Sequence, residues 1–335
     1  MILFSLLIVL HLIVSKLKKS KILLLLSFAI LFILLAYRSV TVGTDTINYN
    51  IQFNVIKSFG FLNIEPLWLY LNKFAIALGG NFQLVLVFAS LLTLIPVFYV
   101  VNKKSPLPFL SIFLYLSLYY YFFSFNIMRQ CIAMSFGLLS IMFFNDNKIK
   151  KSLFFLLIAV LFHYSAIVLI PGIIMIKFLS KLKALQLSLL QLFTLFIGVF
   201  FSTSIVSVST KYFYSNYNIE ESLNFLGNFI VILALNILFY ILGRLIKNKN
   251  YWYYFCLIFL YISNILTLVP YGKRVVMYYG ILFIIFFPLV LKDNLLEKKY
   301  NHLFFALIVL FGVFNFFINF GKGEIFPYTN VLFHD

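Results

Sequence analysis

Residues Gln83 to Val101 read QLVLVFASLLTLIPVFYVV, a run without a charged side chain. Such a run can cross a bilayer as an α-helix, since about 20 apolar residues rise about 30 Å. Similar runs recur along the chain of 335 residues, which is 64% hydrophobic, only 10% charged and has a mean hydropathy of +1.06. Soluble domains carry roughly 25% charged residues, so the composition excludes a soluble globular domain. Solid apolar runs, unlike the alternating segments of a β-barrel, predict an all-α polytopic membrane protein.

The apolar runs predict about twelve transmembrane helices in a single integral membrane domain, residues 1–335. The runs are 1–15, 22–36, 83–101, 107–123, 127–144, 153–162, 164–179, 184–203, 228–243, 251–269, 275–291 and 302–320. Residues 153–162 are too few to cross about 30 Å, so they and 164–179 are expected to form a broken or tilted pair around His163 and Pro171. The first run lacks a basic region before it and a cleavage site after it, so we expect it to be a retained span.

Positive charge indicates how these spans are oriented. The chain has 26 Lys and Arg against 9 Asp and Glu, an excess that would suggest nucleic acid as the partner of a soluble chain. Here 18 of these cations fall in alternate loops, and loops rich in Lys and Arg face the cytoplasm. We therefore expect no nucleic-acid partner, and we place both termini, a polar segment of about 37–80 and a loop of about 204–227 on the outer face. Within the polar segment, Glu65 to Gly80 is predicted to be a re-entrant or interfacial helix.

Three arginines lie at outward span ends, on the side where basic residues are usually scarce: Arg38, Arg129 and Arg274. A guanidinium stays charged at neutral pH and donates two parallel hydrogen bonds to phosphate oxygens. The three together therefore predict a pyrophosphate-binding set. The alternative for each arginine alone is that it reaches out to lipid headgroups.

A histidine and two carboxylates are the candidate proton-transfer groups. His163 lies between two apolar half-segments, and imidazole suits a general base at neutral pH; the alternative is a structural bond to a nearby carbonyl. Asp45 follows Gly43 by two positions and Glu65 directly precedes Pro66, and both glycine and proline favour turns or helix ends. Either acid fits a structural role, as a helix cap or an ion-pair partner, or a chemical role, as a base or a ligand of sugar hydroxyls.

The sequence carries none of the common soluble catalytic motifs, such as a P-loop or a zinc-protease motif. Cys131 and Cys256 lie singly inside predicted spans, without disulfide or metal-site spacing. We therefore expect neither a metal nor another cofactor. A reaction on the outer face without nucleotides needs a substrate that is already activated, and a lipid-linked pyrophosphate glycan meets that need.

Several short motifs follow one another along the predicted outer face. The stretch Tyr37 to Tyr49 reads YRSVTVGTDTINY, with arginine followed by G-T-D and a later tyrosine. The later motifs are Glu65-Pro66-Leu67-Trp68, Arg129-Gln130-Cys131-Ile132-Ala133, Phe162-His163-Tyr164-Ser165-Ala166, Arg274 to Tyr278 and Pro327-Tyr328. In this order they resemble the motifs of the EpsG family of exopolysaccharide and O-antigen polymerases. The resemblance covers almost the whole chain, although no motif anchors it between about 180 and 263.

The resemblance implies a Wzy-type polymerase in the bacterial cytoplasmic membrane, with its active face outside the cytoplasm. Such an enzyme transfers a growing glycan from undecaprenyl pyrophosphate to a lipid-linked repeat unit. Arg129 and Arg274 would stabilise the departing pyrophosphate, with Arg38 supporting. His163 would accept the proton of the acceptor hydroxyl, with Asp45 or Glu65 as the competing candidate. The expected supporting residues are Gly43, Thr44, Gln130, Tyr278 and Tyr328. The implied partners are the lipid-linked oligosaccharide, membrane lipids and a polysaccharide chain-length regulator.

Other functions stay open from the sequence. A flippase for the same lipid-linked oligosaccharide would have a similar number of spans. Transporters, however, bind substrate near the bilayer midplane, where Asn236 and Asn264 are the main polar residues and are expected to bridge helices. An O-antigen ligase would use much the same arginines and base. An acyltransferase is a weaker alternative, because no acidic residue lies close to His163 in the sequence.

Overall fold

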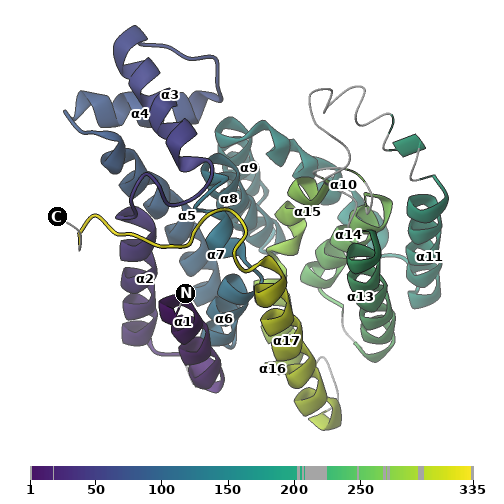
Figure 1. The fold of residues 1–335 in the computed structure, drawn as a ribbon. Coiled ribbons are helices and arrows are strands. Elements are labelled where there is room, and N and C mark those ends of the chain that lie inside the picture. Colours follow the sequence, from purple (N-terminus) through teal and green to yellow (C-terminus); the bar gives the residue numbers. More distant parts are fainter. Residues whose placement is uncertain are drawn as a thin grey trace.

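The computed structural model describes residues 2–17, 19–201, 204–205, 207, 225–246, 249–266, 269, 272–292 and 298–332, and it is all-α, as predicted. The predicted outer loop of about 204–227 lies almost entirely outside the described residues. In chain order the elements are α1 (Ile2–Ile13), the 3-10 helix η1 (Val14–Lys16), α2 (Lys21–Ala36), α3 (Thr46–Phe59), α4 (Pro66–Ala77), α5 (Phe82–Lys104), α6 (Pro108–Ser117), α7 (Tyr120–Phe123), α8 (Met128–Asn145), α9 (Ile149–Phe162), the 3-10 helix η2 (Tyr164–Val168), α10 (Leu169–Leu179), α11 (Ala184–Phe200), α13 (Phe225–Leu245), α14 (Tyr251–Ile265), α15 (Gly272–Gly280), α16 (Phe283–Lys292) and α17 (Lys298–Asn319) (Figure 1).

The apolar helices are consistent with a multi-pass membrane protein. Among the described residues, three helical stretches are long and apolar enough to cross a bilayer, namely Phe82–Lys104, Arg274–Lys292 and Lys299–Asn319. The shorter apolar helices are Ile2–Lys16, Lys21–Ala36, Pro108–Ser117, Tyr164–Leu179, Ala184–Phe200, Ile230–Leu245 and Tyr251–Ile265. The expectation of about twelve crossings remains a prediction.

Several predicted runs are interrupted where the backbone leaves the helical region. The predicted pair around His163 is broken as expected: α9 ends at Phe162, and His163 has an extended backbone with φ −158° and ψ 117°. Two runs that we predicted as continuous are also divided. Residues 107–123 form α6 and α7, because Tyr119 between them has a positive φ of 73°, and residues 275–291 are interrupted at Ile281 and Leu282 between α15 and α16.

The polar segment after α2 folds into two helices, α3 and α4, which stand out at one end of the bundle (Figure 1). The predicted helix from Glu65 to Gly80 is α4, which begins with Pro66 in its first turn and ends at Ala77. Proline suits this position because its missing N–H has no partner in the first turn and its fixed φ fits a helix. Helix α3 was not separately predicted. Helix α4 packs against α3, α5 and α9, so it is tied to the bundle.

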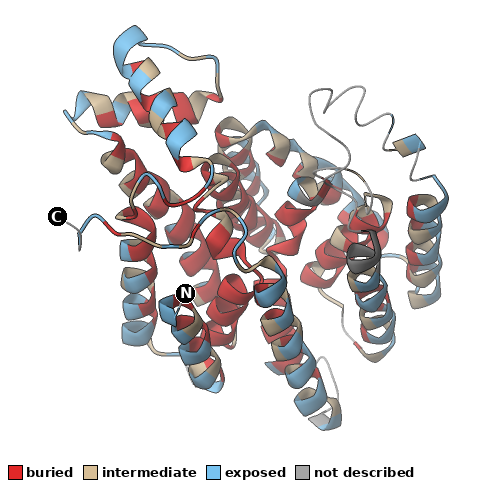
Figure 2. Cartoon of the chain, viewed as in Figure 1, coloured by how far each residue is buried: buried red, intermediate tan, exposed pale blue. Residues whose placement is uncertain are grey.

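The buried core lies around α5, α6, α8 and α16, whereas α1, α2, α11, α13 and α17 surround it (Figure 2). Every residue of α6 is buried. The outer faces of the surrounding helices carry exposed large apolar side chains such as Leu25, Ile237 and Phe314. Extensive exposed apolar surface is rare on soluble monomers, and here it fits contact with lipid.

Buried amides join α11, α13 and α14. The side-chain nitrogen of Asn236 donates to Asn264 at 2.7 Å, and that of Asn264 donates to Thr194 at 3.0 Å. The side-chain nitrogen of Gln191 donates to the carbonyl of Asn236 at 2.6 Å. The expectation that Asn236 and Asn264 bridge helices is therefore confirmed.

The C-terminal segment after α17 returns across the bundle and pairs with the segment after α2 (Figure 1). Arg38 and Asn330 form an isolated antiparallel bridge. The amide of Ser39 donates to the carbonyl of Thr329 at 3.0 Å, and the amide of Gly43 donates to that of Glu324 at 3.0 Å. Two sequence motifs from opposite ends of the chain are thus brought together.

Candidate active site

Glu65 is the centre of a charged cluster at the end of the bundle where α3 and α4 stand. It directly precedes α4, and only 8% of its side chain is exposed. One carboxylate oxygen, Oε2, forms an ion pair with Arg129 in the first turn of α8. The other, Oε1, lies 2.6 Å from Nδ1 of His163, just after α9. Three helix ends therefore bring one acid and two basic side chains into contact.

His163 is held by its backbone as well as by Glu65. Its amide donates to the carbonyl of Ala159 at 3.0 Å, and its carbonyl accepts from the amide of Ala166 at 3.0 Å. The side chain is 28% exposed. A carboxylate bound to one ring nitrogen fixes the orientation of the imidazole. With Nδ1 occupied by Glu65, Nε2 is the ring atom suited to take a proton from a substrate.

The electrostatics of the cluster distinguish Glu65 from His163 as the base. Burial raises the pKa of the Glu65 carboxyl, but the hydrogen bond with His163 and the positive charge of Arg129 outweigh this, and its pKa falls below the usual value. A carboxylate with a lowered pKa is a poor proton acceptor at neutral pH. The arrangement therefore favours Glu65 as the group that orients His163.

Arg129 lies between Glu65 and an aromatic pair. Its guanidinium carbon is 5.6 Å from the centre of the Tyr49 ring, which makes a T-shaped contact with Trp68 at 5.2 Å. The side chain is 23% exposed. A guanidinium has five N–H donors in a fixed fork. Arg129 therefore keeps donors for a further acceptor while it is paired with Glu65.

Helix α15 brings Arg274 and Tyr278 to the same cluster. The side-chain nitrogen of Gln130 donates to the carbonyl of Arg274 at 2.6 Å, and the side chain of Arg274 is exposed. One turn later, the hydroxyl of Tyr278 lies 2.9 Å from that of Ser165, two residues after His163. These two contacts fix α15 against α8 and η2. The side chain of Lys273, which precedes Arg274, lies outside the described residues.

Arg38 has a different environment from the other two arginines. It is only 1% exposed, and its Nη1 donates to the carbonyl of Leu35 at 2.6 Å. Its Nη2 lies 3.0 Å from Sδ of Met128 and its guanidinium lies 5.1 Å from the Phe125 ring centre. Burial lowers the pKa of Arg38 to about 10, so it remains charged at neutral pH. Arg38 is thus buried against Met128, the residue that precedes Arg129 at the start of α8, and does not lie on the exposed surface.

The G-T-D motif forms the tight turn into α3. Gly43 has a φ of 93°, and a Cβ at this position would overlap the carbonyl oxygen of Phe125. The amide of Thr44 donates to the carbonyl of Gly323 at 3.1 Å. Asp45 directly precedes α3 without a side-chain capping bond, and no described contact joins it to His163. The structure therefore brings Glu65, Arg129 and His163 together and places Asp45 in the adjacent turn.

Tyr328 lies on the returning C-terminal segment. Its hydroxyl donates to the carbonyl of Leu34 at 2.7 Å and accepts from the side chain of Asn330 at 2.9 Å. Its ring lies 6.3 Å from that of Phe125, the residue that also contacts Arg38. Tyr328 therefore contacts the residues around Arg38, and no described bond joins it to Glu65 or His163.

Sequence reasoning missed three features of this site. It did not pair Glu65 with His163, because the two are 98 positions apart. It did not include Tyr49 and Trp68 among the site residues, although Tyr49 ends the stretch from Tyr37 and Trp68 ends the motif that begins at Glu65. It did not join Ser165 to Tyr278. Within the described residues, no three His, Cys, Asp or Glu side chains are grouped so that they could hold a metal ion.

Comparison with known proteins bears on the identity of the chain. No curated protein and no solved structure matches it. The EpsG family model matches residues 21–330, a range that includes every residue of the cluster described above. The chain belongs to the EpsG family, and so to the helical membrane proteins of exopolysaccharide biosynthesis.

Proposed function

We propose that the protein is a polysaccharide polymerase, a membrane glycosyltransferase that acts on the outer face of the bacterial cytoplasmic membrane. Its donor would be a growing glycan on undecaprenyl pyrophosphate and its acceptor a lipid-linked repeat unit. The observation that carries the proposal is the Glu65–His163 pair with Arg129 on the same carboxylate. It combines a general base with cationic donors, as transfer from a glycosyl pyrophosphate requires.

In the proposed reaction, the acceptor hydroxyl attacks the anomeric carbon of the donor sugar. The bond from that carbon to the phosphate oxygen breaks, and its electron pair leaves with the lipid pyrophosphate. The hydroxyl proton passes to Nε2 of His163, while Glu65 stabilises the resulting imidazolium. Charge grows on the pyrophosphate during this step, so fixed guanidinium groups stabilise the transition state more than the ground state.

The arginines would divide these tasks by their positions. Arg129 and the exposed Arg274 are proposed to contact the pyrophosphate. They are joined through Gln130, which follows Arg129 and binds the Arg274 carbonyl at 2.6 Å. Arg38 is proposed to hold the start of α8, and so Arg129, in position through its contact with Met128. All these residues lie at helix ends, which fits an enzyme acting at one face better than a transporter binding substrate at the midplane.

The test is a gel of surface polysaccharide and lipid-linked intermediates from a deletion strain. The deletion strain would be complemented with wild type, with His163→Gln or with His302→Gln, and the membrane insertion of each protein would be measured in parallel. His302 is an exposed histidine on α17 and serves as the matched control. We expect the deletion and His163→Gln to leave single repeat units on outward-facing lipid, and wild type and His302→Gln to restore the polymer ladder. Accumulation of single units facing the cytoplasm would indicate a flippase and overturn the proposal.

A further inference from the structure

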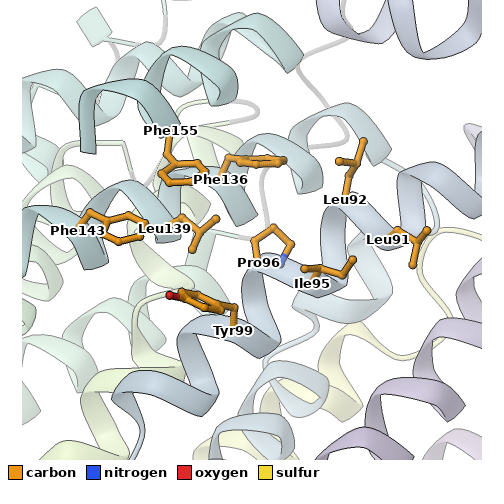
Figure 3. Close-up of a pocket in the computed structure, with 9 residues that line it drawn as sticks. All are labelled: Leu91, Leu92, Ile95, Pro96, Tyr99, Phe136, Leu139, Phe143 and Phe155. Atoms are coloured by element: carbon orange, nitrogen blue, oxygen red, sulfur yellow. The ribbon is translucent and has the colours of Figure 1, made fainter. Parts of the chain in front are cut away.

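An open apolar groove lies between α5, α8 and α9, with a cavity volume of about 360 Å³ (Figure 3). Phe136, Leu139 and Phe143 of α8 and Phe155 of α9 face Ile95 and Tyr99 of α5 across the groove. No charged residue lines it. Its outer edge is accessible, because Ile95 is 52% exposed. The volume falls in the range of small-molecule sites, about 300–1,000 Å³.

The groove and the charged cluster share the same face of α8. Residues seven positions apart in an α-helix lie on nearly the same side, two turns or about 10 Å apart. Arg129, Phe136 and Phe143 have this spacing. The face of α8 that presents Arg129 to Glu65 therefore continues toward the C-terminal end of the helix, where it forms a wall of the groove.

A stack of aromatic rings connects the groove to His163. The Phe143 and Phe155 rings are stacked at 5.3 Å, Phe155 and Phe136 at 6.1 Å, and Phe136 and Phe162 at 6.0 Å. Phe162 is the last residue of α9, directly before His163. The groove wall is thus continuous from the middle of α8 to the base of the proposed active site.

We infer that this groove binds the isoprenoid tail of the lipid-linked substrate. The inference rests on the proposed function, which places a pyrophosphate at Arg129. The apolar chain attached to that pyrophosphate has to leave the site into the bilayer, and this groove begins about two helical turns below Arg129 on the same helix face. The polar end of the substrate meets the guanidinium, and its apolar end meets a wall of phenylalanines.

The first test is photo-crosslinking in lipid nanodiscs. The probe is a polyprenyl pyrophosphate with a diazirine in its isoprenoid chain, and the comparison probe is phosphatidylglycerol with a diazirine in an acyl chain. We expect the polyprenyl probe to label peptides of α5 and α8 that line the groove, and excess polyprenyl pyrophosphate to compete. Equal labelling of the groove by both probes, without competition, would assign it to bulk lipid and overturn the inference.

The second test fills the groove. Ile95→Trp adds a bulky ring at its open edge, and Ile237→Trp makes the same change on α13, where Ile237 is similarly exposed at 55%. We expect Ile95→Trp to raise the KM for lipid-linked repeat units about tenfold, the scale of a mismatch in an apolar pocket. Ile237→Trp should leave KM unchanged, and both variants should unfold at the wild-type temperature.

The two proposals fail separately. If wild type makes polymer but Ile95→Trp and Ile237→Trp have the same KM, the groove proposal falls and the polymerase proposal stands. If wild type makes no polymer from lipid-linked units yet the polyprenyl probe labels the groove, the polymerase proposal falls and the isoprenoid site remains.

Discussion

Nδ1 of His163 lies 2.6 Å from Oε1 of Glu65, although 98 positions separate them in the sequence. The contact exists because α9 ends at Phe162 and α4 begins at Pro66, so that two helix ends meet. It gives His163 the acidic partner that its sequence neighbourhood lacks. The absence of such a neighbour was our reason for ranking an acyltransferase low, and the structure removes that reason. Our preference for glycan transfer in the proposed function therefore depends on membership of the EpsG family.

The first prediction separates the base from the group that orients it. His163→Gln should lower the turnover of lipid-linked units by about 10²- to 10⁴-fold, the usual contribution of a general base. Glu65→Gln should cost about tenfold to a hundredfold, since hydrogen bonds to charged groups contribute about 1.5–3 kcal/mol. Asp45→Asn is the comparison, because no described contact joins Asp45 to Glu65, Arg129 or His163. If Asp45→Asn matched the loss of His163→Gln, Asp45 would be the better candidate for the base.

The second prediction concerns Arg274, whose side chain is exposed in the first turn of α15. Arg274→Ala should lower kcat/KM by about tenfold to a hundredfold through the loss of a charged hydrogen bond to the leaving group. Lys57→Ala removes an exposed cation on α3 and controls for net charge. Initial rates of polymer formation at several concentrations of lipid-linked repeat units give kcat/KM, and polymer length and yield are read from gels of the same reactions. Unchanged yield in Arg274→Ala would remove Arg274 from the leaving-group assignment.

The third prediction follows from the lowered pKa of Glu65. The pKa of Glu65 is lower in the folded protein than its usual value of 4.5. Its charge therefore stabilises the folded state at any pH above 4.5, and this stabilisation is lost as the pH falls from 4.5 through the folded-state pKa. The midpoint temperature of detergent-solubilised wild type should exceed that of Glu65→Gln between pH 5 and 8, where the carboxylate stays ionised. The difference should narrow below about pH 4.5. A difference that stays constant down to pH 3 would show that the Glu65 charge does not contribute.

The fourth prediction uses two glycines to isolate the tight turn into α3. Gly43→Ala and Gly60→Ala both place a side chain at a positive φ, 93° and 73° respectively. A Cβ at Gly43 also overlaps the Phe125 carbonyl, whereas none is near at Gly60. Gly60→Ala should cost about 1 kcal/mol from backbone strain alone. Gly43→Ala should cost about 1–3 kcal/mol more, measured as lower thermal stability; equal costs would mean that the turn shifts to relieve the overlap.

The uninterrupted apolar runs and the composition predicted the helical class, and a run too short to span predicted the break at His163. The interruptions at Tyr119 and at Ile281–Leu282 were not predicted. Apolar side chains continue through both, so hydropathy does not change where the backbone leaves the helix. Helix α3 was also missed, because its sequence TINYNIQFNVIKSF has too few apolar residues to stand out beside membrane spans.

The candidate site was predicted as a set of residue types on one face, and its pairings were not. A sequence marks Arg129, Glu65 and His163 as polar residues among apolar ones, but only the packing of α4 against α9 determines which of them touch. The same limit applies to Arg38. Its position at a span end made it a candidate for an exposed anion-binding residue, whereas the returning C-terminal segment and Phe125 surround it.

The last prediction tests whether Arg38 acts by position or by direct contact. Its side chain is 1% exposed and bonds to the Leu35 carbonyl and to Met128. Arg38→Gln should therefore lower the free energy of unfolding by about 1.5–3 kcal/mol, the contribution of hydrogen bonds from a charged group. In the folded fraction it should lower kcat through Arg129 while the KM for lipid-linked units stays near wild type. Arg38→Lys should restore little, because an ammonium lacks the planar fork that reaches both partners. Arg274→Gln is the converse comparison: it should impair catalysis while lowering stability less than Arg38→Gln, because Arg274 is exposed and Arg38 is buried. If Arg38→Gln instead kept full stability and raised KM, Arg38 would contact the pyrophosphate itself, and the start of α8 would have to open for it to do so.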